Sequence, residues 1–287
     1  MTTLATPGTT PTPTRGTTPV LAGPAAGAGN RTAPPVVRRP IPMRRIVAVE
    51  ARKSFDTRSG FWLLASIGIT AVLATGAVLL WAPRGELTYD AFAAAIGVPM
   101  SILLPVVAIL SVTSEWSQRS GLTTFTLVPH RGRTVLAKAV VAVGTGVASM
   151  LVAMAIGAVG NIVGSAIAGV PTVWDDSLVT LAHIVLANVL GLLVGFMLGV
   201  VIRNSAAATV SYFVYSFVLP TLAMLLATSQ AWFRDLQPWV DFNFTQTALF
   251  DGSLSGAQWA HLGVTGAIWL LAPLAVGVWM LLRSEVK

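Results

Sequence analysis

SEWSQRSGLTTFTLVPHRGRTVLAK, residues 114–138, is a polar, basic stretch that separates two long apolar runs. Its charged residues are Glu115, Arg119, Arg131, Arg133 and Lys138. Joining two helices takes only a handful of residues. We therefore predict that 114–138 is a surface loop, long enough to hold a short helix that a partner could bind.

The composition indicates a membrane protein. The chain has 287 residues, of which 54% are hydrophobic and 10% charged, and its mean hydropathy is +0.75. Soluble domains carry about 25% charged residues, so this chain has too few to cover a surface in water. It has no cysteine, which excludes disulfides and thiolate metal sites.

Apolar runs without Asp, Glu, Lys or Arg recur along the chain. A run of about 20 residues crosses the hydrocarbon core as a helix, and helices satisfy their own backbone in lipid. The sequence therefore predicts an all-α integral membrane protein with six transmembrane helices, at 61–82, 91–113, 139–164, 178–202, 206–228 and 261–282.

Two different segments precede the first predicted span. Residues 1–40 are rich in Thr, Pro, Ala and Gly and are predicted to be a disordered tail without a signal peptide, which leaves 41–287 as the membrane domain. Residues 44–60 mix apolar and charged side chains and are predicted to form an amphipathic helix in the membrane interface. A simple basic anchor is the alternative. The charged residues of this segment that we single out are Glu50, Arg52, Lys53, Asp56 and Arg58.

The charges are distributed very unevenly between the loops. Of the 18 Lys and Arg residues, all except Arg84 and Arg234 fall in the termini and in every second loop, whereas most Asp and Glu fall in the other loops. The positive-inside rule then predicts that both termini and the 114–138 loop are cytoplasmic. The positive net charge follows from this topology, so no nucleic-acid partner is needed.

The 229–260 loop is predicted to be external. It is rich in Trp and Phe at near-helical spacing, which favours short helices at or within the outer interface. These aromatic residues fit either an aromatic belt that holds the loop on the membrane or a gate.

Small residues recur on one face of the fourth span, at Ala187, Gly191, Gly195 and Gly199. Such a face lets another helix approach closely. Ordinary packing within the bundle and a contact in a dimer or with a moving helix both fit it.

Enzyme and nucleotide motifs are absent from the sequence. It contains no GxxxxGK[ST], HExxH or GxSxG pattern, and its spans hold no carboxylate for a proton relay. We therefore expect this chain to hold no catalytic, metal or cofactor site.

The residues around the 114–138 loop resemble those of a transporter family. Glu115 is followed by Gly121, Thr123-Thr124, Val128-Pro129, Arg131 and Ala137-Lys138, and EARKSFDTRSGFWLL from Glu50 precedes the first span. This pattern resembles the permease subunits of bacterial ABC-2 type ABC transporters over residues 44–287. Leu122 stands where the family often has threonine. The excess of Arg over Lys, with abundant Ala and Gly, suggests a GC-rich, actinobacterial source.

The resemblance implies a permease subunit of an ATP-driven exporter in the bacterial cytoplasmic membrane. A separate ATPase subunit would bind ATP and Mg²⁺ and grip the interfacial helix and the 114–138 loop, and a second permease subunit would complete the assembly. We expect apolar anchors to supply most of the docking energy. The coupling residues that we expect are Glu115, Arg119, Gly121, Leu122, Thr123, Thr124, Phe125, Pro129, Arg131 and Lys138. The substrate stays open.

Two other classes of protein fit parts of this pattern. A non-transporting membrane anchor or immunity protein has the same spans, and an adjacent ATPase gene would favour the transporter over it. An intramembrane enzyme would need polar residues that converge within the spans, and the sequence shows no such convergence.

Overall fold

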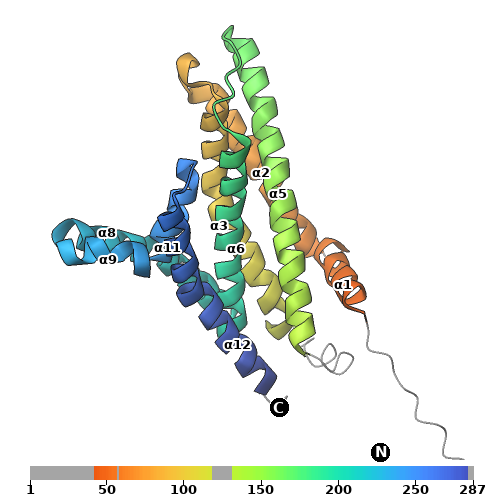
Figure 1. Cartoon of the computed structure of the whole chain (residues 1–287). Helices are drawn as coiled ribbons and strands as arrows, with labels where there is room; N and C mark the ends of the chain where they lie inside the picture. Colours follow the sequence, from red (N-terminus) through yellow and green to blue (C-terminus); the bar gives the residue numbers. More distant parts are fainter. Residues whose placement is uncertain (1–41, 57, 118–130, 284–287) are drawn as a thin grey trace, which may run out of the picture. The chain divides into compact units, whose positions relative to one another are not determined.

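The computed structural model describes residues 42–56, 58–117 and 131–283, and the regular elements in these ranges are helices. Six helical segments are long and apolar enough to cross a membrane, which confirms the predicted all-α, multi-pass membrane fold. Four of them are single helices (Figure 1): α2 (Arg58–Trp81), α3 (Tyr89–Ser117), α5 (Arg131–Ala168) and α6 (Leu178–Ile202). A short helix, α1 (Met43–Asp56), precedes them.

The last two spans are each interrupted by a π-helical turn. Span five consists of α7 (Ser205–Phe213), the π turn η2 (Val214–Val218) and α8 (Leu219–Ser229). Span six consists of α11 (Gly256–Gly266), the π turn η4 (Ala267–Leu271) and α12 (Ala272–Arg283). Each π turn ends two residues before a proline, Pro220 or Pro273.

The helices next to the 114–138 stretch extend further than the sequence predicts. Helix α3 continues to Ser117, and α5 already begins at Arg131. Both ends of the predicted loop are therefore helical. Its middle, 118–130, and the predicted disordered tail, 1–40, lie outside the described residues.

Helix α6 packs closely on α3 through its small-residue face. A Cβ added at Gly195 would lie 2.5 Å from the carbonyl oxygen of Pro105, and one at Gly199 would lie 3.3 Å from the Cβ of Val112. Ala187, on the same face, is fully buried. The face is therefore used for packing within this chain, the first of the two alternatives that the sequence left open.

A tyrosine repairs the break that Pro105 makes in α3. In a regular helix the carbonyl of Ser101 would accept a hydrogen bond from the N–H of residue 105, but proline has none. The hydroxyl of Tyr212, on α7, donates to that carbonyl at 2.7 Å. Tyr212 is only 3% exposed, so α7 is held firmly against α3.

The connection between spans five and six folds into short helices, as predicted. These are α9 (Ala231–Val240), α10 (Phe242–Thr247) and the 3-10 turn η3 (Ala248–Asp251). In Figure 1, α9 lies beside α8, and the two project away from α3, α5 and α6. The aromatic residues divide between two environments, since Phe242 is buried in the core whereas Trp232 and Phe244 are exposed.

Candidate functional site

Helix α1 turns one narrow face toward α5. Ile46 and Glu50, four residues apart and therefore on the same side of the helix, are 7% and 6% exposed. Arg44, Arg45 and Arg52 are exposed. The amphipathic pattern expected from the sequence is present, but its buried face includes a carboxylate.

A buried ion pair joins α1 to α5. Lys138 Nζ lies 2.7 Å from Glu50 Oε2, and Lys53 Nζ lies 3.1 Å from Glu50 Oε1. The side chains of Glu50 and Lys138 are 7% and 12% exposed, against 46% for Lys53. One buried carboxylate thus has two ammonium partners, one from its own helix and one from a helix far along the chain.

The charge state of Glu50 follows from these contacts. Burial alone would raise its pKa, because a charged carboxylate loses solvation. The nearby ammonium groups, Lys138 first and then Lys53, outweigh burial and hold the pKa of Glu50 below its usual value. At neutral pH the group is therefore an ionised carboxylate clamped between two cations.

The structure brings together two residues that the sequence analysis assigned to different groups. Glu50 was predicted in the interfacial helix and Lys138 in the coupling loop, and they bind each other. Lys53 joins them, and Arg52 and Asp56 are exposed on α1. Arg58 begins α2.

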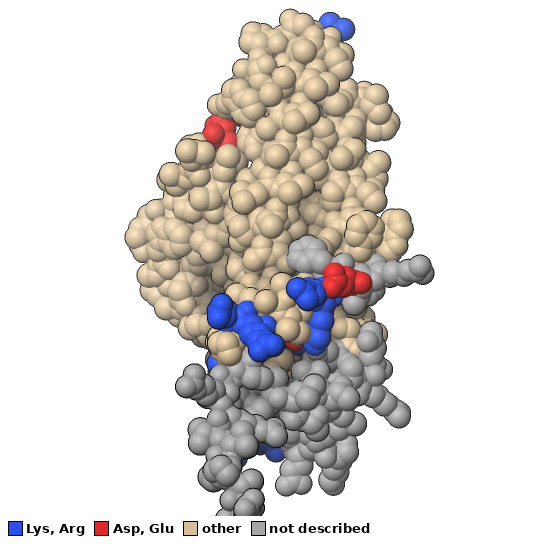
Figure 2. Space-filling view, turned by 90° about the vertical axis from the view of Figure 1, so that its right-hand side faces the viewer, with Lys and Arg blue, Asp and Glu red and all other residues tan. Residues whose placement is uncertain are grey.

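The other predicted coupling residues are described only in part. Glu115 lies in the last turn of α3 and Arg131 at the start of α5, with their side chains outside the description. Figure 2 shows most of the visible Lys and Arg toward one end of this face, with one at the opposite end. The remaining coupling residues lie outside the described ranges: Arg119, Gly121, Leu122, Thr123, Thr124, Phe125 and Pro129.

The predicted packing residues do not belong to this site. Gly191 faces Gln246 of α10, since a Cβ added there would lie 3.3 Å from Gln246 Nε2. That amide nitrogen donates to the carbonyl of Ala187 at 2.7 Å. The small residues therefore admit both α3 and a polar side chain of the segment between spans five and six.

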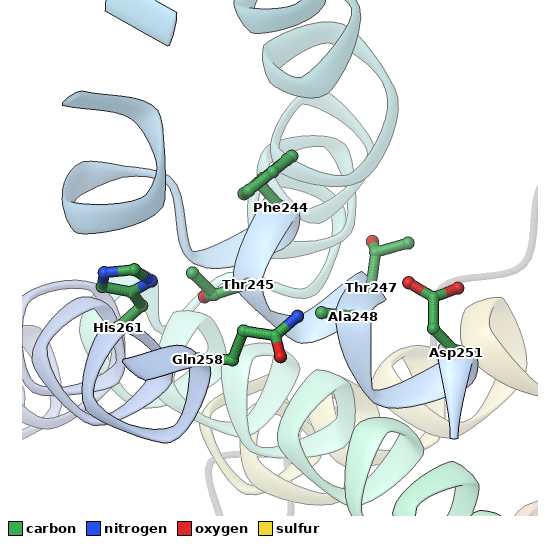
Figure 3. A pocket seen from close by; sticks show the side chains of 7 residues that line it. All are labelled: Phe244, Thr245, Thr247, Ala248, Asp251, Gln258 and His261. Carbon is green, nitrogen blue, oxygen red and sulfur yellow. The ribbon is translucent and has the colours of Figure 1, made fainter. Parts of the chain in front are cut away.

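A pocket lies within the segment between spans five and six and the start of span six. This pocket of about 200 Å³ is lined by Phe244, Thr245, Thr247, Ala248, Asp251, Gln258 and His261 (Figure 3). Gln258 caps the start of α11, where its Oε1 accepts from the N–H of Ser255 at 2.8 Å. The Thr245 hydroxyl lies 2.8 Å from that of Thr265. Hydrogen bonds thus hold two residues of the pocket wall, Thr245 and Gln258, in place.

The aromatic contacts at the two π turns are not evident from the sequence. The rings of Tyr215 and Trp269 are 6.4 Å apart, and Trp269 Nε1 donates to the carbonyl of Val240 at 2.6 Å. Pro220 and Pro273 were the available sequence signal, because a proline inside a span often accompanies a helix irregularity.

Within residues 42–56, 58–117 and 131–283, no three His, Cys, Asp or Glu side chains are placed to hold a metal ion. The comparisons with known proteins place the chain in no family, since no protein-family model matches its sequence and no curated protein matches it.

Proposed function

We propose that this chain is the permease subunit of an ATP-driven exporter of the ABC-2 type. In this proposal a separate ATPase subunit binds the polar stretch between α3 and α5, together with α1. A second permease subunit completes the transport path. The substrate class stays open, and the alternative is a membrane anchor or immunity protein without transport activity.

The buried pair between Glu50 and Lys138 is the observation that supports this proposal best. A partner that pushes on the 118–130 stretch acts directly on the first turns of α5, where Lys138 lies. Because Lys138 is tied to α1 by a 2.7 Å ion pair, α1 and α5 would move together. Because the side chains of Glu50 and Lys138 are only 7% and 12% exposed, their attraction is stronger than that of a pair in water.

We predict that the proposed ATPase loses affinity when Phe125 is replaced by alanine. Leu122 and Phe125 are three residues apart, so on a helix they share a face. Burying an aromatic side chain in a cleft is worth about 1.5–3 kcal/mol, which corresponds to a loss of roughly one to two decades in affinity. The measurement is ATPase recovery with the tagged chain at matched membrane expression.

The matched control is Phe250→Ala, which truncates an exposed phenylalanine in η3. It should leave recovery of the ATPase unchanged. Equal recovery with Phe125→Ala and with the unaltered chain would argue against coupling through this face. If no ATPase copurifies with the unaltered chain from its native membrane, the anchor alternative gains support.

The proposed orientation has its own test. We expect both termini to be cytoplasmic and the segment between spans five and six to be external, because Lys and Arg concentrate in the termini and in alternate loops. Reporter fusions at Lys287 and at Asp241 should give cytoplasmic and external signals, respectively. An external signal at Lys287 would contradict this topology.

A further inference from the structure

We infer that spans five and six hinge at the π turns η2 and η4. Both turns are followed by a proline, and both are placed inside an apolar span. This hinge is a property of the chain itself and does not depend on an ATPase partner.

The backbone hydrogen bonding is interrupted at these two turns. In span five, Leu219 N–H donates five residues back, to Val214, and Pro220 has no N–H. Neither the α nor the π pattern therefore supplies a donor to the carbonyl of Tyr215. Such a gap marks a point where a helix bends easily, because the hydrogen bond that would resist bending is missing.

The same gap occurs in span six. Ala272 N–H donates to Ala267, also five residues back, and the next residue is Pro273. The carbonyl of Ile268 is left without a donor from either helical pattern. The two π turns meet through their side chains, because the rings of Tyr215 in η2 and Trp269 in η4 have centroids 6.4 Å apart.

One half of each span, α7 in span five and α12 in span six, is tied to the core of the bundle. Helix α7 is held to α3 by the bond from Tyr212 and by a 2.8 Å contact between the hydroxyls of Ser205 and Thr113. Helix α12 packs on α6, since a Cβ added at Gly277 would lie 2.8 Å from Val201 Cγ2.

The other half of each span packs on the segment between them. Helix α8 contains no buried residue and contacts α9. Helix α11 packs on α10, where a Cβ added at Gly266 would lie 3.3 Å from the ring of Phe242. The hinge thus separates halves packed on α3 and α6 from halves that pack on α9 and α10. A swing would break the contacts of that segment with α6, namely the bond between Gln246 and Ala187 and the packing of Leu249 in η3.

Spin-label distances test this inference directly, since the chain has no native cysteine. In nanodiscs, we expect a broad distance distribution for label pairs at Ala206 and Thr228 in span five, and at Ala257 and Leu282 in span six. The reference pair is Leu136 and Val159, two exposed positions at similar separation on the uninterrupted helix α5. That pair should give a narrow distribution.

Stiffening variants provide the second arm. Pro220→Ala restores an N–H that can bond to the carbonyl of Tyr215, and Pro273→Ala restores one for the carbonyl of Ile268. Each variant should narrow the distance distribution of its own span toward that of α5. Pro99→Ala, in α3 and away from any π turn, is the matched control, in which the distance distributions of spans five and six should not change. The α5 pair reports whether each variant keeps its fold. The hinge would be overturned if the unaltered spans gave distance distributions as narrow as that of α5. It would also be overturned if the Pro220 and Pro273 substitutions left those distributions unchanged.

Discussion

Replacing Gly195 with leucine is expected to abolish the packing of α6 on α3. Even a Cβ at this position would lie 2.5 Å from the carbonyl oxygen of Pro105 and 2.8 Å from its Cα. Both are backbone atoms, so no side-chain rotation can relieve the clash. Overpacking a core typically costs about 1–3 kcal/mol, and the leucine side chain adds further atoms to this cost. We expect little folded protein after extraction in mild detergent.

Gly195→Ala should give a graded version of this effect, with a lower unfolding midpoint but measurable folded protein. Gly76→Leu on α2 is the control, because a Cβ added there meets no atom within 4 Å. The measurement is the thermal unfolding midpoint and the monodisperse yield of each variant. If Gly195→Leu and Gly76→Leu behaved alike, the contact between α3 and α6 would not be as close as the structure shows.

Replacing Lys138 with methionine is expected to have the second-largest effect. The change keeps the length of the side chain and removes its charge, which leaves Glu50 buried without its closer cation. Breaking a buried ion pair from one side costs up to about 3–5 kcal/mol when the remaining charge has no other partner. Lys53, 3.1 Å from Glu50 Oε1, stays in place and keeps the cost of Lys138→Met below that range. The unfolding midpoint at neutral pH should fall clearly, whereas Arg52→Met, at an exposed position on α1, should change it little.

The pH dependence gives this prediction a distinct signature. The pKa of Glu50 is lowered in the folded protein, so the pair stabilises the fold at neutral pH. That contribution is lost as the pH falls below the ordinary pKa of the carboxyl and through its lowered value. Without Lys138, burial favours the neutral acid, so the carboxylate of Glu50 takes up a proton more readily. The difference between Lys138→Met and the unaltered chain should therefore shrink in acid.

A double variant separates the ion pair from the packing of the two side chains. Glu50→Gln combined with Lys138→Met removes both charges, so its cost should be smaller than the sum of the two single costs. Strictly additive costs would show that the two charges do not interact across α1 and α5.

The sequence alone determined the class of fold. Apolar runs of sufficient length without charged residues leave few options in a bilayer, because each backbone group needs a partner within its own helix. The limits of α6 follow from the pattern as predicted, at 178–202. The short helix before the first span and the short helices between spans five and six were also predictable, since their periodicity is local.

The sequence also indicated a face of small residues on α6, but it did not indicate which element packs on that face. These residues are Ala187, Gly191, Gly195 and Gly199. Small residues permit a close approach by any helix. Only the tertiary structure decided that α3 and Gln246 approach it, because the choice of partner depends on how all six spans are arranged.

Tertiary structure alone decided the pairing of Glu50 with Lys138. The two residues are 88 positions apart, and each also fits a partner-facing role when read locally. The hydrogen bond from Tyr212 to Ser101 and the contact between Tyr215 and Trp269 are of the same kind. Prolines predict that a helix is weakened, but which side chain fills the gap depends on which helices are neighbours. Long-range contacts of this kind have no local signature, so they become visible only when the helices are packed together.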